Sequence, residues 1–206
     1  MTTKITPTKA NLLKSENSLI FSEKGYDLLD RKRTVLIQEM MTLIDSAKTI
    51  EKEIEEKFAQ AYEALKQASL TMGVYNLEEI ALAVSKEKDY YIRFTSVMGV
   101  EIPEIIYEED FNITPYYGFY RSNSSLDRAL HILNEVKYLS YQLAQVETSA
   151  YKLSLEIRKT QKRANALNKI QIPRLEKNIK FIEETLEEKE REDFFRLKMV
   201  KKKNSL

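Results

Sequence analysis

Side chains able to do acid–base chemistry are abundant in this 206-residue chain, but none stands in a pattern typical of nucleophilic or metal chemistry. It contains no cysteine, so thiolate nucleophiles, disulfides and thiolate zinc sites are excluded. The single histidine, His131, has no ligand spacing such as HExxH around it, which disfavours a metal or general-base role. No phosphate-binding glycine loop or nucleophile elbow occurs among the four glycines. The sequence therefore predicts no catalytic, cofactor-binding or metal-binding residue, and no cofactor.

Charge is the remaining chemistry, and it is balanced. Lys and Arg number 33 against 32 Asp and Glu, whereas nucleic-acid binders usually carry a clear basic excess. The carboxylates repeat along the chain and never stand as an isolated pair in an apolar setting, so acid–base catalysis has no candidate site. The longest apolar runs, such as IALAV, fall far below the roughly 20 residues that span a bilayer. We expect neither a nucleic-acid partner nor a membrane span.

The carboxyl-terminal segment supplies the first candidate protein-contact residues. Spacings of four residues from Glu187 to Arg191 and from Glu192 to Arg196 suit ion pairs on a helix, and a solvated charged face is the simplest interpretation. Two aromatic residues in this charged stretch weaken that interpretation, because they would be exposed unless another protein receives them. The candidate contact residues at this end are Arg191, Phe194, Phe195, Arg196 and Lys198.

Two further groups are weighed against structural explanations. Arg31, Lys32 and Arg33 form a basic triplet in which Arg33 occupies a helix-seam position. It is either a snorkelling residue or a charge aimed at a surrounding partner, and the two interpretations are equally favoured. Asn165 and Asn168 precede the Pro173 breaker, where buried polar residues setting coiled-coil register are favoured over a ligand role.

These residues must be positioned by long helices. All four glycines and three of the four prolines lie at or before residue 118. Thr6 and Pro7 form a suitable helix opening, and no strong stop follows before Gly73. A heptad pattern over this span predicts a left-handed coiled coil. Its two series are Leu12, Leu19, Tyr26, Arg33, Met40, Ala47, Ile54, Ala61 and Ala68, and Ser15, Ser22, Leu29, Leu36, Leu43, Ile50, Lys57 and Ala64.

A second helix is expected to begin at the sequence SSLD, with Ser124 and Asp127 as a capping box. Alanines recur at one of its seam positions, which favours close approach of two helices. After Pro173, which should bend the helix, the stripe resumes in a new phase with Leu175, Ile179, Ile182 and Leu186. The seam series before Pro173 are Ala129, Val136, Leu143, Ala150, Ile157 and Ala164, and Ile132, Leu139, Val146, Leu153, Thr160 and Leu167.

The middle of the chain differs from both helices. The sequence NLEEIALAVSK predicts a short helix, and the stretches DYYIRFTSVM and GVEIPEIIY favour a β-hairpin. The fold class is therefore mainly α, with a long antiparallel two-helix coiled coil and a small mixed α/β head. We expect one structural unit made of an amino-terminal helix over residues 1–72, a head over 73–123 and a carboxyl-terminal helix over 124–206.

Antiparallel pairing brings both termini to the same end. About 60 residues at 1.5 Å each give a helix of roughly 90–100 Å. If Ala68 faces Ala129, then Leu12 lies opposite residue 185, and the last 21 residues extend past the paired helices.

Three blocks of the sequence resemble the D subunit of V-type ATPases and of archaeal or bacterial A/V-type ATP synthases. The first is TPTKANLLKSENSLIFSEKGYDLLDRKRTVL, with its PTK, G-x-x-LL and basic cluster. The second is MGVEIP at residues 98–103, expected before the hairpin. The third and most specific is KRANALNKIQIPRLEKNIKFIEETLEEKEREDFFRLKMVKKK. A departure is Thr34, where the family commonly has an acidic residue.

The resemblance implies a central rotor shaft that transmits torque and is not itself an enzyme. Its paired termini would insert into a hexamer of catalytic A subunits and non-catalytic B subunits. Its head would face the membrane rotor ring through a funnel-like subunit, and a small F subunit would bind along the shaft. It also implies a peripheral position on the cytoplasmic face of the plasma membrane, in a prokaryote.

Two other functions fit the heptads alone. One is a non-rotary coiled-coil scaffold or tether, which a homodimeric rod would favour. The other is a basic-tipped helical module docking on anionic membrane, which would bind lipid less tightly as salt rises. The sequence blocks above favour the rotor.

Overall fold

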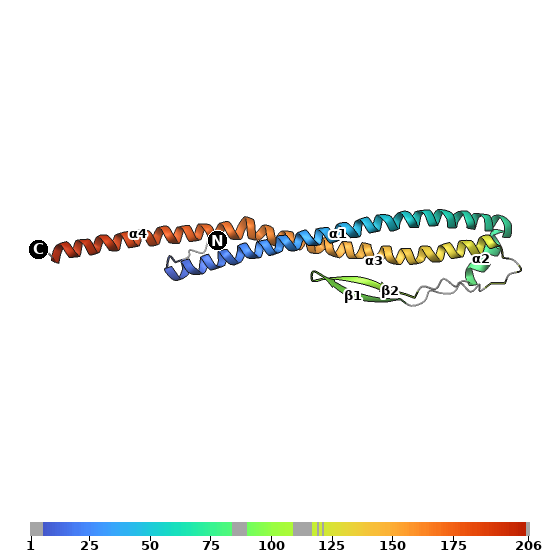
Figure 1. Cartoon of the computed structure of the whole chain (residues 1–206), viewed down its shortest axis with the longest axis horizontal. Helices are drawn as coiled ribbons and strands as arrows, with labels where there is room; N and C mark the ends of the chain where they lie inside the picture. Colours follow the sequence, from blue (N-terminus) through green and yellow to red (C-terminus); the bar gives the residue numbers. More distant parts are fainter. Residues whose placement is uncertain (1–5, 84–89, 109–116, 119, 121, 205–206) are drawn as a thin grey trace. The chain divides into compact units, whose positions relative to one another are not determined.

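A computed structural model of the chain describes residues 6–83, 90–108, 117, 118, 120 and 122–204. The chain forms two compact units, one of Met1–Val35 with Ile157–Leu206 and the other of Leu36–Glu156. The elements follow the order α1, α2, β1, β2, α3, η2 and α4 (Figure 1).

Helix α1 (Lys9–Met72) is continuous for 64 residues. The Thr8 hydroxyl accepts from the Asn11 N–H at 3.3 Å and caps the helix. Thr6 was predicted for this role, but its backbone carbonyl instead accepts from the Asn11 side chain. The helix ends where the sequence predicts, because Gly73 adopts a φ of 81°, a left-handed conformation that favours glycine.

The predicted heptad seam of α1 is confirmed. All 17 of its positions are buried or half-buried, and Leu36, Ala61 and Ala68 are fully buried. Ser15 and Ser22 are also buried, and the Ser22 hydroxyl donates to the carbonyl of Ser18 in its own helix. The seam hydroxyl is therefore satisfied without a partner from the opposing helix.

Helix α3 (Ser124–Ala166) begins at the predicted residue, and its predicted seam positions are likewise all buried or half-buried. Ala129, Val136 and Ala164 are among its buried residues. The Asp127 carboxylate, expected to complete a capping box, accepts a hydrogen bond from the Tyr117 hydroxyl.

Between α3 and helix α4 (Ile172–Asn204) lies one turn of π-helix, η2 (Leu167–Gln171). The Ile172 N–H donates to the carbonyl of Leu167, five residues back. The prediction placed the irregularity at Pro173, whereas the structure places it in the preceding turn. Widening the backbone there accommodates a proline that cannot donate to the turn before it.

The π-helix also explains the predicted change of phase. Seam residues alternate by four and three positions up to Leu167, and the same alternation starts again at Ile172. The step between these two is five residues, one more than a heptad needs. The seam residues on either side are Leu153, Ile157, Thr160, Ala164 and Leu167, and then Ile172, Leu175, Ile179, Ile182 and Leu186.

Antiparallel pairing is visible inside each compact unit. In the unit Leu36–Glu156, Lys57 contacts Glu135, and Asn123 Nδ2 donates to Thr71 Oγ1 at 3.0 Å. In the other unit, Lys9 Nζ lies 2.8 Å from Glu190 Oε1, and Arg33 Nη1 donates to Gln161 Oε1 at 2.7 Å. Partners thus move backward along one helix as they move forward along the other.

The head contains the predicted short helix and hairpin. Helix α2 spans Val74–Ala83, and β1 (Tyr91–Val97) pairs antiparallel with β2 (Val100–Ile106). The block at residues 98–103 was expected before the hairpin, but it forms the turn and the first half of β2. Half of the expected YYGFYR segment, namely residues 116, 119 and 121, lies outside the described residues.

The fold class is therefore confirmed as mainly α, with two long helices in a coiled coil and a two-stranded hairpin. The division into segments 1–72, 73–123 and 124–206 stays a prediction. In the described part of the chain, no helix is both long and apolar enough to span a bilayer.

Candidate protein-contact site

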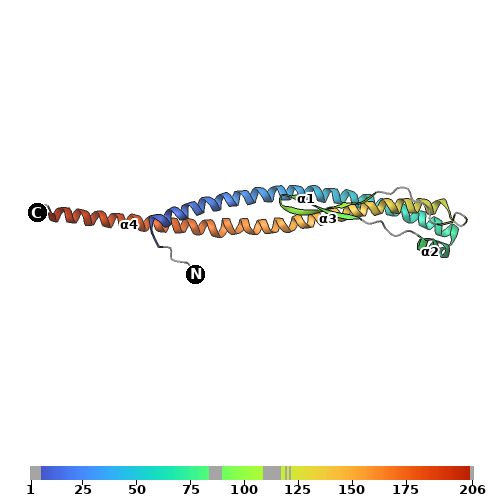
Figure 2. The same cartoon turned by 90° about the horizontal axis from the view of Figure 1, so that it is seen from below.

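The end of α4 carries five of the candidate residues. Every side chain from Glu187 to Lys203 is exposed, as expected of a segment extending past the paired helices. Figures 1 and 2 show the end of α4 running beyond the start of α1, its partner in this unit. The predicted ion pairs are present, with Arg191 Nη2 at 3.5 Å from Glu187 Oε2 and Arg196 Nη2 at 3.5 Å from Glu192 Oε2.

Exposed apolar side chains surround this end of α4. Phe194 and Phe195 are each 66% exposed. At about 100° per residue, the apolar side chains project to every side of the helix and form no single stripe. A flat surface or a shallow groove could cover only part of this set, whereas a socket could cover all of it. The set comprises Phe194, Phe195, Leu197, Met199 and Val200.

The basic triplet divides into inward and outward members. Arg31 is exposed, while Lys32 and Arg33 are half-buried. The Arg33 guanidinium contacts Asp30 Oδ1 at 2.5 Å and Gln161 Oε1 at 2.7 Å. Arg33 therefore links the two helices of its unit, in agreement with the structural interpretation, and only Arg31 points its whole charge to solvent.

Asn165 and Asn168 do not fit the expected buried role, because both are exposed. The Asn165 side chain accepts from Gln161 Nε2 at 3.2 Å and so extends the polar chain from Arg33. Asn168 lies in the π-helix directly after the seam residue Leu167, so its position is off the seam. Their part in protein contacts remains a prediction.

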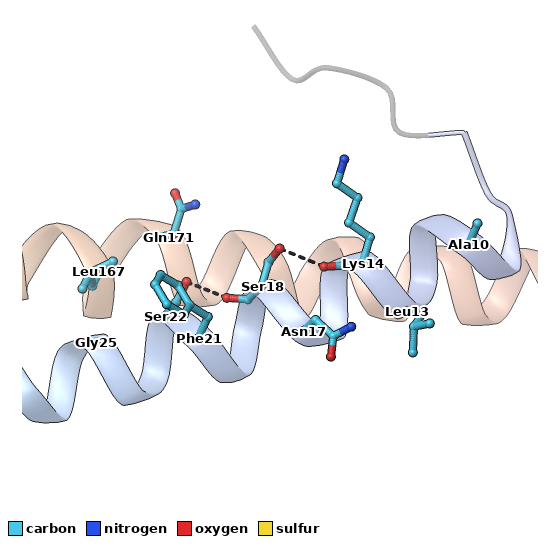
Figure 3. A pocket seen from close by; sticks show the side chains of 10 residues that line it. All are labelled: Ala10, Leu13, Lys14, Asn17, Ser18, Phe21, Ser22, Gly25, Leu167 and Gln171. Carbon is cyan, nitrogen blue, oxygen red and sulfur yellow. Dashed lines mark hydrogen bonds between the residues drawn. The ribbon is translucent and has the colours of Figure 1, made fainter.

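A hollow of about 690 Å³ lies in the unit that contains both chain ends (Figure 3). Leu167 and Gln171 of η2 form one wall, and the face of α1 around Phe21 forms the other. The π-helix helps to open this space, because its extra residue displaces the backbone from a regular path. The α1 residues that line it are Ala10, Leu13, Lys14, Asn17, Ser18, Phe21, Ser22 and Gly25.

Sequence reasoning missed the exposed apolar face beside this hollow. Leu13, Ile20, Phe21 and Leu28 are each 48% exposed or more. The signal was present, because Leu13 and Ile20, and likewise Phe21 and Leu28, recur at heptad spacing outside the seam positions. Such a second stripe indicates a surface that another chain can cover.

Two ion pairs link opposing helices. The Lys9 ammonium lowers the pKa of the Glu190 carboxyl, chiefly through their hydrogen bond. Glu190 in turn raises the pKa of Lys9 through the same bond. Lys57 likewise lowers the pKa of Glu135, chiefly through their hydrogen bond. His131 Nδ1 lies 3.4 Å from Glu135 Oε1. The lone histidine thus belongs to a helix-linking cluster, and the sequence showed Lys57 in the seam but not its partner.

Aromatic residues attach the hairpin to α3. The rings of Tyr107 and Tyr138 stack with centroids 5.3 Å apart, and Tyr141 lies 5.3 Å from Tyr107 and 5.7 Å from Tyr90. Tyr138 and Tyr141 are three residues apart and share one face of α3. That spacing was the available sequence signal for this cluster.

The geometry is that of a protein with exposed apolar surfaces at a helix end and along a helix face. Comparison with known proteins agrees with the sequence blocks. A model of the family of ATP synthase D subunits matches residues 11–202. The chain belongs to the ATP synthase D-subunit family.

Similar proteins of this family cover nearly the whole chain. The D subunit of the V-type ATP synthase of Thermotoga neapolitana is 42% identical over 199 residues, which are 97% of this chain and 98% of the relative. The D subunit of the A-type ATP synthase of Pyrococcus furiosus is 40% identical over 201 residues, or 96% and 94% of the two chains. That of Thermococcus sibiricus is 38% identical with the same coverage. This member of the D-subunit family is thus part of a multisubunit ATP synthase, which couples ATP chemistry to ion transport.

Proposed function

We propose that this chain is the central rotor shaft of its ATP synthase and transmits torque between the catalytic hexamer and the ion-translocating membrane ring. The observation that carries the proposal is the end of α4, where exposed apolar side chains project on all sides of one helix. Apolar side chains on every side of one helix, even between charged ones, leave water together only where the helix is enclosed. The central opening of a ring of subunits would provide such an enclosure.

The proposed mechanism needs a stiff, asymmetric shaft and no catalytic residue. Two paired helices resist twisting better than one, and an end consisting of α4 alone contacts the three catalytic sites of a hexamer unequally. Rotation would then change which site is favoured. During hydrolysis the sites turn the shaft, and during synthesis ion flow turns it and the shaft alters the sites. The chain itself would bind no nucleotide, cofactor or nucleic acid.

Partners follow from the same arrangement. The A and B subunits of the hexamer would contact Phe194, Phe195, Arg196 and Lys198, with Arg191 and the triplet Arg31–Arg33 farther along. A small F subunit would cover the side of the shaft. A funnel-like subunit would bind the head, whose exposed apolar residues include Val74, Tyr75, Leu82 and Tyr120. The chain would then lie peripherally on the cytoplasmic face of the plasma membrane.

Truncation tests the shaft function. Removing residues 187–206 should leave the paired helices folded but uncouple ATP hydrolysis from ion transport, because the enclosed end is lost. The measurement is ATP-driven ion uptake by the reconstituted complex, alongside its ATPase rate. A second truncation, of residues 201–206 only, removes Lys201, Lys202 and Lys203 and keeps the apolar set, so it should retain coupling. Unchanged ion uptake after the longer truncation would contradict the proposal.

Point substitutions make the test sharper. Phe194→Ala with Phe195→Ala should weaken binding of the chain to the isolated hexamer by at least roughly tenfold. The matched control is Phe181→Ala, which removes a 55% exposed ring from the paired part of α4 and should leave binding within about twofold. Equal effects of the two changes would mean that the end of α4 has no special role in binding.

Stoichiometry separates a shaft from a tether. Native mass spectrometry of the complex gently isolated with a tagged copy should show one copy of this chain per hexamer. A stable homodimer free of ATPase subunits would instead support a scaffold. Salt-sensitive binding to anionic vesicles in place of hexamer binding would support the membrane-docking function.

A further inference from the structure

Strand β1 has one edge that no other described residue pairs with, here called its free edge. The sheet has two strands, and β2 lies between β1 and α3, where the Ile105 N–H donates to Gln145 Oε1 at 2.9 Å. On β2, Val100 and Pro103 are buried, whereas Tyr91–Ser96 of β1 are all exposed. Figures 1 and 2 both show the hairpin lying along α3.

The pairing register identifies the backbone groups on that edge. The turn has two residues, and Val97 pairs with Val100 to close it. In such a hairpin the closing pair exchanges both hydrogen bonds, and bonded and non-bonded pairs then alternate along the ladder. The N–H and C=O groups of Ile92, Phe94 and Ser96 therefore point away from β2.

The opposite edge confirms this alternation. By the same rule Pro103 and Ile105 of β2 point outward, and Pro103 lacks an N–H while Ile105 donates to Gln145. Neither Pro103 nor Ile105 therefore leaves an unpaired N–H on the outer edge of β2. Among the described residues, no hydrogen bond reaches the outward groups of Ile92, Phe94 or Ser96.

The devices that normally protect an edge strand from pairing are missing on β1. Proline and lysine do not occur between Tyr91 and Val97. The one charge, Arg93, is taken up by Glu104 of β2, whose Oε2 accepts from Nε at 3.0 Å and from Nη2 at 2.7 Å. Tyr91, Ile92 and Phe94 are 72%, 53% and 58% exposed. A seven-residue edge whose one charge is already paired and which exposes large apolar side chains is a template for another strand.

We propose that the free edge of β1 receives an extended strand from a different subunit of the ATP synthase complex. Only another strand supplies N–H and C=O groups at the alternating spacing that Ile92, Phe94 and Ser96 present. The added strand would be uncharged, because Arg93 is already neutralised. It would carry apolar residues at alternate positions on the α3 side, where Lys152 Nζ lies 4.7 Å from the Phe94 ring centre.

Size argues against a second copy of this chain as the occupant. Two seven-residue edges pairing by themselves bury far less than the roughly 1,200 Å² of a stable specific dimer. A subunit already held in the complex by other contacts needs no such area, since its strand binds at high effective concentration. The inference rests on membership of the complex and is independent of torque transmission.

Residue-resolved hydrogen exchange tests the pairing. In the free chain the outward amides of Ile92, Phe94 and Ser96 should exchange quickly, and the amides of Arg93 and Thr95, bonded within the hairpin, should exchange slowly. In the assembled complex the three outward amides should slow by at least roughly tenfold. Outward amides that exchange equally fast in both states would overturn the proposal, whatever the complex does in ion transport.

A proline substitution separates backbone pairing from side-chain contact. Ser96→Pro removes an outward N–H without removing a hairpin bond, and Ser96→Ala keeps that N–H. In the complex, the Ile92 and Phe94 amides of the proline variant should exchange about fivefold faster than those of the natural chain. In the alanine variant their exchange rates should be unchanged. Slow exchange of Arg93 in the free variant checks that the hairpin is intact. Equal protection in both variants would contradict strand addition.

Cross-linking identifies the occupant. The natural chain has no cysteine, so Ser96→Cys offers a single attachment point for a short photoreactive group. A cross-link in the purified complex to an extended segment of another subunit supports the proposal. A cross-link to a second copy of this chain, or to a helix, overturns it.

Discussion

At the scale of single residues, the hairpin turn holds Met98 in a left-handed backbone conformation that methionine adopts unfavourably. Met98 and Gly99 have φ values of 52° and 80°, as a two-residue hairpin turn requires. Glycine adopts this conformation freely, but methionine does not. Met98 is 51% exposed, so little packing compensates for the strain.

Met98→Asn should therefore stabilise the hairpin. Asparagine tolerates the left-handed conformation, so we expect a gain of about 0.5 kcal/mol in the free energy of unfolding. Chemical denaturation monitors the whole chain, and exchange of the Thr95 amide monitors the hairpin itself. Met98→Val is the opposite control, because a β-branched residue there should destabilise the turn.

The ion pair between Glu135 and Lys57 makes the free energy of unfolding depend on pH. Lys57 lowers its pKa from the ordinary value of 4.5, so the ion pair stabilises the folded state above that value and ceases to do so as pH falls through the lowered one. Glu135→Gln should cost about 0.5 kcal/mol at pH 7, and this difference from the natural chain should vanish at low pH. Thermal unfolding between about pH 7 and 3 gives the comparison. Glu63→Gln, at an exposed position of α1, should show no such pH dependence.

At the scale of elements, the π-helix η2 keeps the apolar seam continuous across Pro173. The seam on either side follows the heptad, and the one extra residue in η2 restores its phase. Removing one residue from η2 should therefore turn an irregular seam into a regular one.

Deleting Ile170, which is 66% exposed, together with Pro173→Ala should leave a continuous α-helix with an uninterrupted seam. We expect helix content by circular dichroism and the unfolding temperature to be at least maintained. Deleting Lys162 with the same Pro173→Ala is the control, because loss of that exposed residue moves the seam residues Ala164 and Leu167 by one position out of the heptad. A similar loss of stability in both variants would show that η2 does not set the phase.

Long helices and their seam could be predicted from the sequence because heptad spacing alone determines which residues are buried. The hairpin could be predicted because strand-favouring residues flank Met98 and Gly99. The π-helix could not be located, since the stripe shows that its phase changes but not which turn absorbs the change. The buried role expected for Asn165 failed for a different reason, because Ala164 and Leu167 hold the seam positions and Asn165 lies one residue beyond Ala164. Pairings such as Arg33 with Gln161 depend on lateral distances that the spacing of residues in one helix does not contain.

At the scale of the whole molecule, function depends on surfaces that the folded chain leaves uncovered. The exposed apolar groups lie at the end of α4, on the α1 face beside the hollow, on α2 and on β1. No isolated soluble chain benefits from so many such surfaces, whereas a component of a complex has several neighbours to cover them.

The isolated chain should accordingly self-associate through these surfaces. Binding to the other subunits should prevent that self-association. We expect light scattering of the isolated chain to rise with concentration and temperature, and Phe194→Ser with Phe195→Ser to reduce that rise several-fold. Addition of the isolated hexamer should give the same reduction with the natural chain. Scattering unaffected by either treatment would place the self-associating surface elsewhere.

The composition of the compact units has a consequence for biosynthesis. Arg33 and its partner Gln161 are 128 positions apart, so the start of α1 leaves the ribosome long before the segment it pairs with exists. At cellular translation rates the delay is roughly 10 s. The unit Leu36–Glu156, in contrast, can close while synthesis continues. The nascent amino-terminal segment, with its seam residues Leu12 and Leu19 uncovered, is thus the stretch of this chain that a ribosome-associated chaperone has the longest opportunity to hold.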